Sequence, residues 1–194
     1  GRASAIRSGE LHIDVAFLGA PSCDPYGNAN GYSRDDDDGI SCGSLGYART
    51  DAEFADKVII ITNNIVSYPN APWAIPEHDV DYVVRVDDIG DPKGIMSGAT
   101  RYTKDPKELL IAKTAANVVE AAGYLYDGFS MQMGSGGASL ATARFIRQKM
   151  LDKGIYCRFA LGGITGQITA MHEEGLIDRI LDVQSFDLDA AKSL

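Results

Sequence analysis

The segment Phe129-Ser-Met-Gln-Met-Gly-Ser-Gly-Gly-Ala-Ser-Leu-Ala141 predicts a strand, a glycine turn and a helix in direct succession. The strand is expected over Tyr124 to Met133, and the helix from Ser139 to about Lys153. The helix would bury an apolar face formed by Leu140, Ala143, Ile146 and Met150.

The turn between this strand and this helix consists of Gly134, Ser135, Gly136 and Gly137. Glycines let the backbone approach a ligand without a Cβ, and the following helix N-terminus supplies unpaired N–H groups. We predict that the turn binds a phosphate or a reaction oxyanion, although a tight turn without a ligand has the same pattern.

The same order of elements recurs around this segment. After it, a strand is expected over Ile155 to Leu161, a loop over Gly162-Gly-Ile-Thr-Gly166, a short helix from Gln167 to about Glu174, and a strand over Arg179 to Phe186. Before it, a helix starts at Pro106 with Asp105 as its N-cap and ends at Gly123. Strands that alternate with helices predict a parallel sheet, whose ligands lie beyond the carboxyl ends of the strands.

The first half of the chain also favours an α/β fold. Strands are expected over His12 to Pro21, Val58 to Thr62 and Asp81 to Val86. A short helix is expected over Asp51 to Lys57, with Thr50 as its N-cap.

Composition and charge limit the classes of protein to which the chain can belong. The 194 residues are 45% hydrophobic, which is enough for a packed core, and the formal net charge is −9. This charge argues against nucleic acid as a partner. No apolar run reaches about 18 residues, so we expect a soluble, cytoplasmic protein without a membrane partner. The cysteines Cys23, Cys42 and Cys157 have no metal-binding spacing and are expected to be free thiols. The chain opens on Gly1 rather than Met, so we expect a segment of a longer protein.

Several familiar sites are absent from the pattern. The glycine turn lacks the Gly-Lys-Ser/Thr of a P-loop, and the strand after its helix lacks the terminal acidic residue of a dinucleotide fold, so NAD is not expected. The acidic run Asp35-Asp-Asp-Asp38 lacks the ligand spacing of a calcium loop. His12, His78 and His172 form no recognisable catalytic pair, and we predict no metal site.

Two arginines are candidates for binding a carboxylate substrate. Arg101 follows the glycine-containing stretch Ser97-Gly-Ala-Thr, and Arg144 lies on the second turn of the helix after the glycine turn. A planar guanidinium holds carboxylates in a bidentate manner, although each arginine could instead form a surface ion pair.

Seven motifs, in order, resemble the citrate lyase alpha subunit family. They are Ser8-Gly-Glu-Leu-His-Ile-Asp-Val-Ala-Phe-Leu-Gly-Ala-Pro-Ser-Cys-Asp24, Gly27-Asn-Ala-Asn-Gly-Tyr32, Cys42-Gly-Ser-Leu-Gly-Tyr-Ala48, Ser97-Gly-Ala-Thr-Arg101, Phe129 to Ala141, Phe159-Ala-Leu-Gly-Gly-Ile-Thr165 and Leu181-Asp-Val-Gln-Ser-Phe-Asp187. The resemblance covers the whole chain but only an interior stretch of that longer subunit.

The resemblance implies a CoA-transferase-like (NagB/RpiA-type) α/β fold with mostly parallel open sheets flanked by helices. Residues 1–103 would be the later part of a first half, and residues 104–194 the earlier part of a second half. Substrate contacts are expected from Arg101 and Arg144, and from members of the shared motifs, namely Asn28, Ser44, Gly162, Gly163 and Thr165.

The implied activity is transfer of an acyl carrier protein thioester from acetate to citrate. The partners would be the beta (lyase) and gamma (acyl carrier) subunits of citrate lyase, with the alpha subunit forming a homo-oligomer within the complex. No cofactor would bind directly, because the gamma subunit carries a CoA-derived prosthetic group, for which CoA or acetyl-CoA can substitute.

One departure from related CoA-transferases bears on the mechanism. Many of them carry a glutamate, on the loop after the second strand of the second half, that forms a covalent thioester. The corresponding place here is Gly162-Gly163, so the resemblance implies direct exchange through a mixed anhydride. Two alternatives remain: an acetyl-CoA hydrolase or other CoA-transferase of the same fold, and a non-catalytic scaffold part of the citrate lyase complex.

Overall fold

The computed structural model describes residues 1–32, 42–90 and 103–193. The chain divides into two compact units, Gly1–Ile95 and Met96–Leu194. The expected boundary between residues 103 and 104 stays a prediction, and the acidic run at 35–38 lies outside the described residues. Among the described residues, no helix combines the length and the apolarity needed to cross a bilayer.

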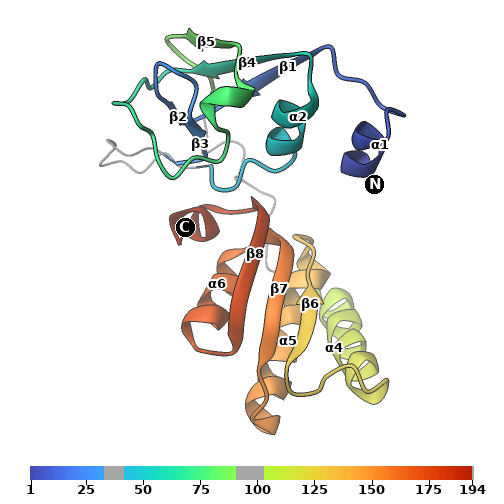
Figure 1. Ribbon diagram of the computed structural model, residues 1–194. Coiled ribbons are helices and arrows are strands. Elements are labelled where there is room, and N and C mark those ends of the chain that lie inside the picture. Colours follow the sequence, from blue (N-terminus) through green and yellow to red (C-terminus); the bar gives the residue numbers. More distant parts are fainter. Residues whose placement is uncertain (33–41, 91–102, 194) are drawn as a thin grey trace. The chain divides into compact units, whose positions relative to one another are not determined.

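Unit 1 contains a three-stranded parallel sheet in the order β1-β4-β5 and a small antiparallel pair, β2-β3. Its elements are α1 (Arg2–Arg7), β1 (Val15–Gly19), β2 (Ser22–Cys23), β3 (Ala29–Asn30), α2 (Ala48–Phe54), β4 (Lys57–Thr62), a 3₁₀ turn (Glu77–Asp79) and β5 (Tyr82–Arg85). The core lies on one face of the larger sheet, where Ala16, Leu18, Val58 and Ile60 pack against Ala52 of α2 (Figure 1). The three strands predicted here are confirmed: β1 and β5 are shorter than predicted, and β4 begins one residue earlier, at Lys57.

The predicted N-cap at Thr50 is wrong. Helix α2 starts three residues earlier than expected, with Tyr47 as its N-cap residue, and Lys57 already belongs to β4. The chain turns at Gly46, whose φ is 62°, and the Ala48 N–H donates to the Leu45 carbonyl oxygen across this turn, so the helix begins at Ala48. Thr50 therefore lies inside the helix.

Unit 2 contains a second three-stranded parallel sheet, in the order β6-β7-β8. Its elements are α4 (Pro106–Ala121), β6 (Phe129–Gln132), α5 (Gly137–Lys153), β7 (Cys157–Ile164), α6 (Gly166–Glu173), β8 (Ile177–Ser185) and α7 (Leu188–Lys192). Helices α5 and α6 connect successive strands, and α4 packs against α5 (Figure 1). This alternation confirms the predicted parallel α/β class.

The helix ends of unit 2 follow the sequence signals closely. The Asp105 side chain accepts a hydrogen bond of 2.9 Å from the Lys107 N–H, and Pro106 occupies the first helical position, as predicted. Helix α4 ends at Ala121, just before Gly123 with φ 79°. The predicted apolar face of α5 is also confirmed, because Leu140, Ala143, Ile146 and Met150 are all buried.

Candidate active site

The turn Gly134–Gly137 connects the carboxyl end of β6 to the first residue of α5. Gly136 is the N-cap residue, and no side chain caps the helix. Among the hydrogen bonds that the described residues make, none is donated by the N–H groups of Gly134, Ser135, Gly136 or Gly137. A Cβ added at Gly136 would meet no atom within 4 Å. In the part of the chain that the structure describes, the turn therefore presents backbone donors without an acceptor at the positive end of a 17-residue helix, with open space at Gly136.

The second predicted glycine loop is wrong. Strand β7 continues to Ile164, so Gly162 and Gly163 are strand residues, paired with β8. Gly162 has φ 98° at an irregularity in the register between β7 and β8. At Gly163, a Cβ would lie 1.8 Å from the Phe186 ring, so this glycine is required by packing. The sequence alone did not indicate that a ring from beyond β8 covers this position.

The N-terminus of α6 is already occupied by a carboxylate of the protein. Asp187 accepts hydrogen bonds of 2.9 and 3.0 Å from the Gly166 N–H, and its Oδ1 also accepts one of 2.8 Å from the Ala190 N–H. Thr165, the N-cap residue of α6, is buried, and its hydroxyl has no hydrogen-bond partner in the described structure. As far as the described residues go, the N–H groups before α5 have no acceptor, whereas Asp187 accepts from the N-terminus of α6.

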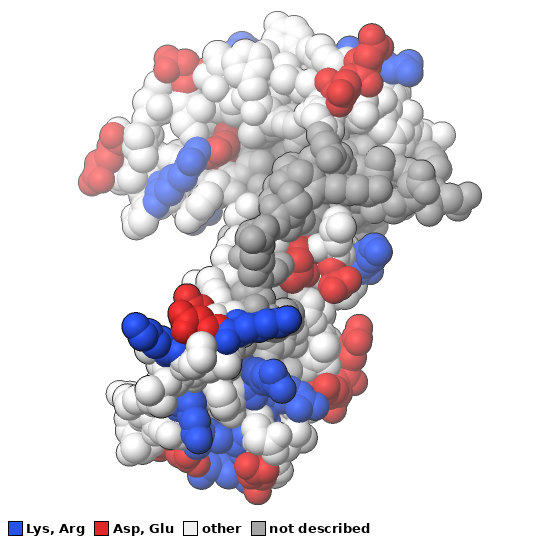
Figure 2. Space-filling view, turned by 180° about the vertical axis from the view of Figure 1, so that it is seen from behind, with Lys and Arg blue, Asp and Glu red and all other residues white. Residues whose placement is uncertain are grey.

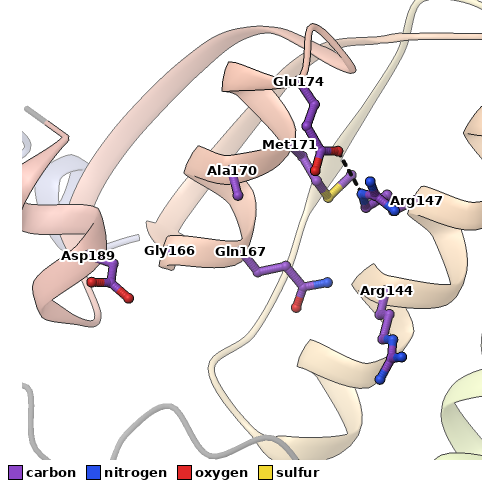
Figure 3. Close-up of a pocket in the computed structure, with 8 residues that line it drawn as sticks. All are labelled: Arg144, Arg147, Gly166, Gln167, Ala170, Met171, Glu174 and Asp189. Atoms are coloured by element: carbon purple, nitrogen blue, oxygen red, sulfur yellow. Dashed lines mark hydrogen bonds and ion pairs between the residues drawn. The ribbon is translucent and has the colours of Figure 1, made fainter.

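Arg144 lies at a pocket of about 530 Å³ between α5, α6 and α7. The pocket is lined by Arg144, Arg147, Gly166, Gln167, Ala170, Met171, Glu174 and Asp189 (Figure 3). Arg147 Nε donates a hydrogen bond of 2.7 Å to Glu174 Oε2 across the pocket. Within the described part of the chain, Arg147 has an ion-pair partner at this pocket and Arg144 has none. Its role as a carboxylate ligand stays a prediction.

Charge is distributed unevenly along the chain. Residues 96–194 contain equal numbers of acidic and basic residues, so the net charge of −9 resides entirely in residues 1–95. Figure 2 shows Lys and Arg side chains gathered on the helix-bearing face of unit 2. An anionic substrate is thus repelled less by unit 2 than by unit 1.

Asn28 is part of a buried polar network in unit 1. Its Nδ2 donates hydrogen bonds of 2.8 Å to Asp24 Oδ2 and 3.0 Å to Glu77 Oε2, and its Oδ1 accepts one from the Glu77 N–H. Asp24, which is fully buried, is the centre of this network. Asn28 is therefore engaged within the fold, and its contact with a substrate stays a prediction.

The structure does not decide the role of two other predicted substrate contacts, Ser44 and Arg101. Ser44 is half-buried in the turn before α2, and Arg101 lies outside the described residues.

Cys23 and Cys157 are buried free thiols, while Cys42 is half-buried. Burial raises the pKa of Cys23 to about 12 and that of Cys157 to about 11. Neither thiol is a thiolate near neutral pH, so neither is a ready nucleophile.

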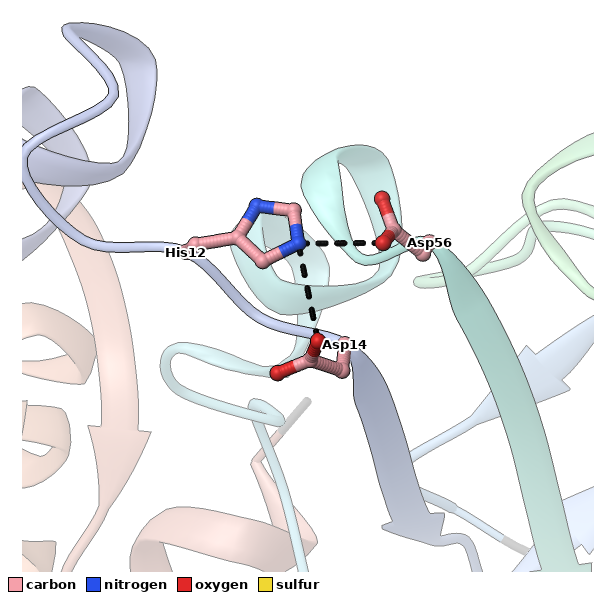
Figure 4. Close-up of side chains that lie close together, drawn as sticks. All are labelled: His12, Asp14 and Asp56. Atoms are coloured by element: carbon pink, nitrogen blue, oxygen red, sulfur yellow. Dashed lines mark hydrogen bonds and ion pairs between the residues drawn. The ribbon is translucent and has the colours of Figure 1, made fainter.

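His12 lies close to two acidic side chains at the surface of unit 1. Its Nε2 is 3.0 Å from Asp56 Oδ2 and 3.8 Å from Asp14 Oδ1 (Figure 4). All three side chains are largely exposed, and the contact with Asp56 joins the segment before β1 to the connection between α2 and β4. Exposed ion pairs of this kind contribute little to stability.

Gln132, the last residue of β6, lies two residues before the glycine turn and was not among the predicted site residues. Its amide nitrogen lies 3.0 Å from the point where a Cβ at Gly162 would stand. The signal in the sequence is a polar residue at the carboxyl end of a parallel strand, where such sheets bind ligands.

Comparison with known proteins identifies the family. The citrate lyase alpha subunit family (CitF) matches residues 1–194. The chain belongs to this family. The citrate lyase alpha chain of Haemophilus influenzae is 56% identical over 194 residues, which are 100% of this chain and 38% of the relative. The chain therefore spans a little over one third of the length of the curated relatives it matches.

Solved structures agree with this membership. The putative alpha subunit of citrate lyase from Streptococcus mutans, in complex with citrate, is 58% identical with a TM-score of 0.92. The match covers all of this chain and 37% of that one. A second match is a 4-hydroxybutyrate CoA-transferase from Porphyromonas gingivalis, which is 18% identical with a TM-score of 0.57. This match covers 97% of the present chain and 44% of the transferase chain. That likeness shows the fold alone and confirms the predicted CoA-transferase-like class.

Proposed function

We propose that the citrate lyase alpha chain carrying these residues transfers an acyl carrier protein thioester from acetate to citrate. The observation that carries this proposal is the set of unused N–H donors at Gly134–Gly137. The related Streptococcus mutans structure is a complex with citrate, which supports citrate as the accepting carboxylate. Arg144, and Arg101 outside the described residues, are the proposed cationic ligands of that carboxylate.

The proposed reaction is a direct exchange between two bound substrates. A citrate carboxylate oxygen attacks the carbonyl carbon of the acetyl thioester, the C–S bond breaks, and a mixed acetyl–citryl anhydride and a free thiolate form. The thiolate then attacks the citryl carbonyl of the anhydride, and acetate leaves. Both nucleophiles are already anionic, so no general base is required.

Each step passes through a tetrahedral intermediate with a negatively charged oxygen. Backbone N–H groups that point at this oxygen stabilise it more strongly than the ground-state carbonyl, and one such donor is worth about 3–4 kcal/mol. The free turn before α5 supplies donors of this kind, whereas Asp187 already takes the Gly166 N–H of α6. We therefore place the reacting carbonyl at the Gly134–Gly137 turn.

The other proposed properties follow from family membership. The partners are the beta (lyase) subunit and the gamma (acyl carrier) subunit, whose CoA-derived prosthetic group carries the thioester and can be replaced by CoA or acetyl-CoA. The alpha subunit forms a homo-oligomer within a cytoplasmic citrate lyase complex.

Replacing Gly136 with valine tests the proposed oxyanion site. In the full-length subunit we expect exchange of labelled acetate into the acetyl carrier to slow by about 100- to 1,000-fold, with an unchanged melting temperature. The valine side chain meets no atom of the fold within 4 Å of its Cβ, but it fills the space above the turn. Ala122→Val is the control, because Ala122 is the exposed C-cap residue of α4 and does not belong to the glycine turn. Normal exchange by Gly136→Val would favour a scaffold role.

The absence of an acyl-enzyme can be tested with borohydride, which reduces thioesters formed on a glutamate. The place of that glutamate is taken by Gly162-Gly163, and the Phe186 ring fills the space beside Gly163. We expect no loss of exchange activity when borohydride is added together with the acetyl carrier. Inactivation with reduction of one specific glutamate would contradict direct exchange.

A further inference from the structure

The side-chain amide of Gln167 joins helix α6 to the backbone of helix α5. In the amide orientation that satisfies both backbone groups, its Nε2 donates a hydrogen bond of 3.1 Å to the Leu140 carbonyl oxygen, and its Oε1 accepts one of 2.9 Å from the Arg144 N–H. Leu140 and Arg144 are four residues apart, so an α-helix ordinarily bonds these two groups to each other. Gln167 therefore contacts α5 at both ends of one helical hydrogen bond.

This contact lies between two features of the proposed site. The Leu140 N–H donates a hydrogen bond of 3.0 Å to the Gly136 carbonyl oxygen, which closes the first helical turn after the glycine turn. Arg144, the proposed carboxylate ligand, lines the same pocket as Gln167 (Figure 3). Hydrogen bonds thus link Gly136 to Leu140, and Leu140 through Gln167 to Arg144.

The start of α5 has few constraints of its own. Three of the four residues of the Gly134–Gly137 turn are glycines, which restrict the backbone least, and no side chain caps the helix. Leu140 is buried, but apolar burial is non-directional, whereas a hydrogen bond prefers a narrow range of distance and angle. Oxyanion donors are effective only when they are held in a fixed direction. Gln167 supplies a directional constraint from a neighbouring helix.

Gln167 projects from a part of α6 that is itself held in place. The Gly166 N–H donates to both carboxylate oxygens of Asp187, at 2.9 and 3.0 Å. On the other side of Gln167, the Ile168 side chain is only 2% exposed, and Thr169 Oγ1 donates a hydrogen bond of 3.0 Å to the Gly166 carbonyl oxygen. A fixed support of this kind lets one side chain set the position of the helix that it contacts.

We infer that Gln167 is a positioning residue, which holds the first two turns of α5 so that the donors of the glycine turn and the Arg144 guanidinium keep one relative arrangement. Gln167 acts through α5 and does not touch the reacting atoms. Its effect on catalysis rests on the proposed function, whereas its hold on α5 can be measured without any reaction.

Amide hydrogen exchange measures the hold on α5 directly. Gln167→Met in the full-length subunit keeps the length of the side chain and removes both hydrogen bonds. We expect exchange over residues 137–144 to become at least about fivefold faster, because local opening of this segment is easier. The melting temperature should stay close to that of the unsubstituted subunit, since the Leu140 and Arg144 groups can still bond to each other.

Gln148→Met is the matched control for this measurement. Gln148 is an exposed residue of the same helix, and its amide donates a hydrogen bond of 2.8 Å to Asp152 within α5. Its exchange rates over residues 137–144 should equal those of the unsubstituted subunit. Gln167→Ala should accelerate exchange in the same direction as Gln167→Met. Unchanged exchange in both Gln167 variants would overturn the inference.

Kinetics then test whether the hold on α5 serves the reaction. We expect Gln167→Met to slow acetate exchange by about tenfold and to raise the KM for citrate, because small misplacements of binding groups are costly. In an Arg144→Ala background, the same substitution should raise the KM for citrate by less than about twofold, since the guanidinium that Gln167 positions is gone. Equal effects with and without Arg144 would indicate a general structural role and overturn the inference.

The two proposals fail in different ways. Normal exchange of acetate by Gly136→Val would contradict the proposed function. Slow exchange by Gly136→Val together with normal exchange by Gln167→Met would contradict the role of Gln167 alone.

Discussion

Replacing Asp24 with alanine is expected to lower the stability of the full-length subunit by about 4 kcal/mol or more. The Asp24 carboxylate is fully buried and accepts five hydrogen bonds. Four come from the N–H groups of Tyr26, Gly27, Asn28 and Asn70, at 2.9 to 3.2 Å, and one comes from the Asn28 side chain. Alanine removes the acceptor of the N–H groups of Tyr26, Asn28 and Asn70, whereas the Gly27 N–H and the Asn28 side chain keep the Asp24 carbonyl oxygen and Glu77. Each unsatisfied buried donor costs about 1–3 kcal/mol.

The melting temperature of the transition that contains unit 1 checks this prediction. Asp24→Asn should lose less than Asp24→Ala, because the amide keeps one acceptor oxygen for the turn at Tyr26 to Asn28. Asp14→Ala serves as the control, since the Asp14 side chain is 88% exposed and should change stability by less than about 1 kcal/mol. A melting temperature for Asp24→Ala equal to that of the control would contradict the assigned role.

The same network predicts a dependence of stability on pH. Burial alone would raise the pKa of Asp24, but the hydrogen bonds from the Asn70 N–H, the Asn28 side chain and the Tyr26 and Asn28 N–H groups outweigh it and lower the pKa. A lowered pKa in the folded state means that the unfolded chain takes up the proton first as pH falls. The contribution of Asp24 is therefore complete above the ordinary pKa of about 4 and is lost below it. Asp24→Asn should remove this part of the acid dependence.

Replacing Gly163 with alanine is expected to cost about 3 kcal/mol or more, without a matching loss of exchange activity per folded molecule. The new Cβ would lie 1.8 and 2.1 Å from the Cε2 and Cζ atoms of Phe186. The Phe186 backbone is held beside β7, because its N–H donates a hydrogen bond of 2.7 Å to the Ile164 carbonyl oxygen. The ring would have to leave its present rotamer, or strand β7 or β8 would have to shift.

A second substitution separates packing from chemistry at this position. Gly163→Ala combined with Phe186→Ala should be less destabilised than the sum of the two single variants, because the clash is absent once the ring is removed. Additive losses of stability in the double variant would show that Phe186 does not confine Gly163. A Gly163→Ala protein that melts normally but no longer exchanges acetate would return this glycine to the substrate site.

Short sequence patterns predicted the structure correctly where interactions within one or two helical turns determine it. Asp105 and Pro106 started α4 as predicted, because a side-chain acceptor and a fixed φ act within one helical turn. The spacing of Leu140, Ala143, Ile146 and Met150 gave the buried face of α5 for the same reason. Thr50 failed as an N-cap because the earlier turn at Gly46 allowed Ala48 to begin the helix.

Structural roles that depend on residues far apart in the chain could not be predicted from short sequence patterns. The pattern Gly162-Gly-Ile-Thr-Gly166 looks like a ligand loop, but pairing with β8 and the Phe186 ring make its two leading glycines part of a strand. Asp24 and Asn70 are 46 positions apart in the chain, so their hydrogen bond has no signature in either local motif.

The sequence by itself determined the family, the parallel α/β class and the glycine turn after β6, because motifs, periodicity and turn residues are encoded over short stretches. Only the tertiary structure distinguished two similar glycine patterns, one with free donors at Gly134–Gly137 and one whose helix is capped by Asp187. The physical reason is that a backbone N–H has the same chemistry in both loops, and only the folded neighbours decide whether it is already satisfied.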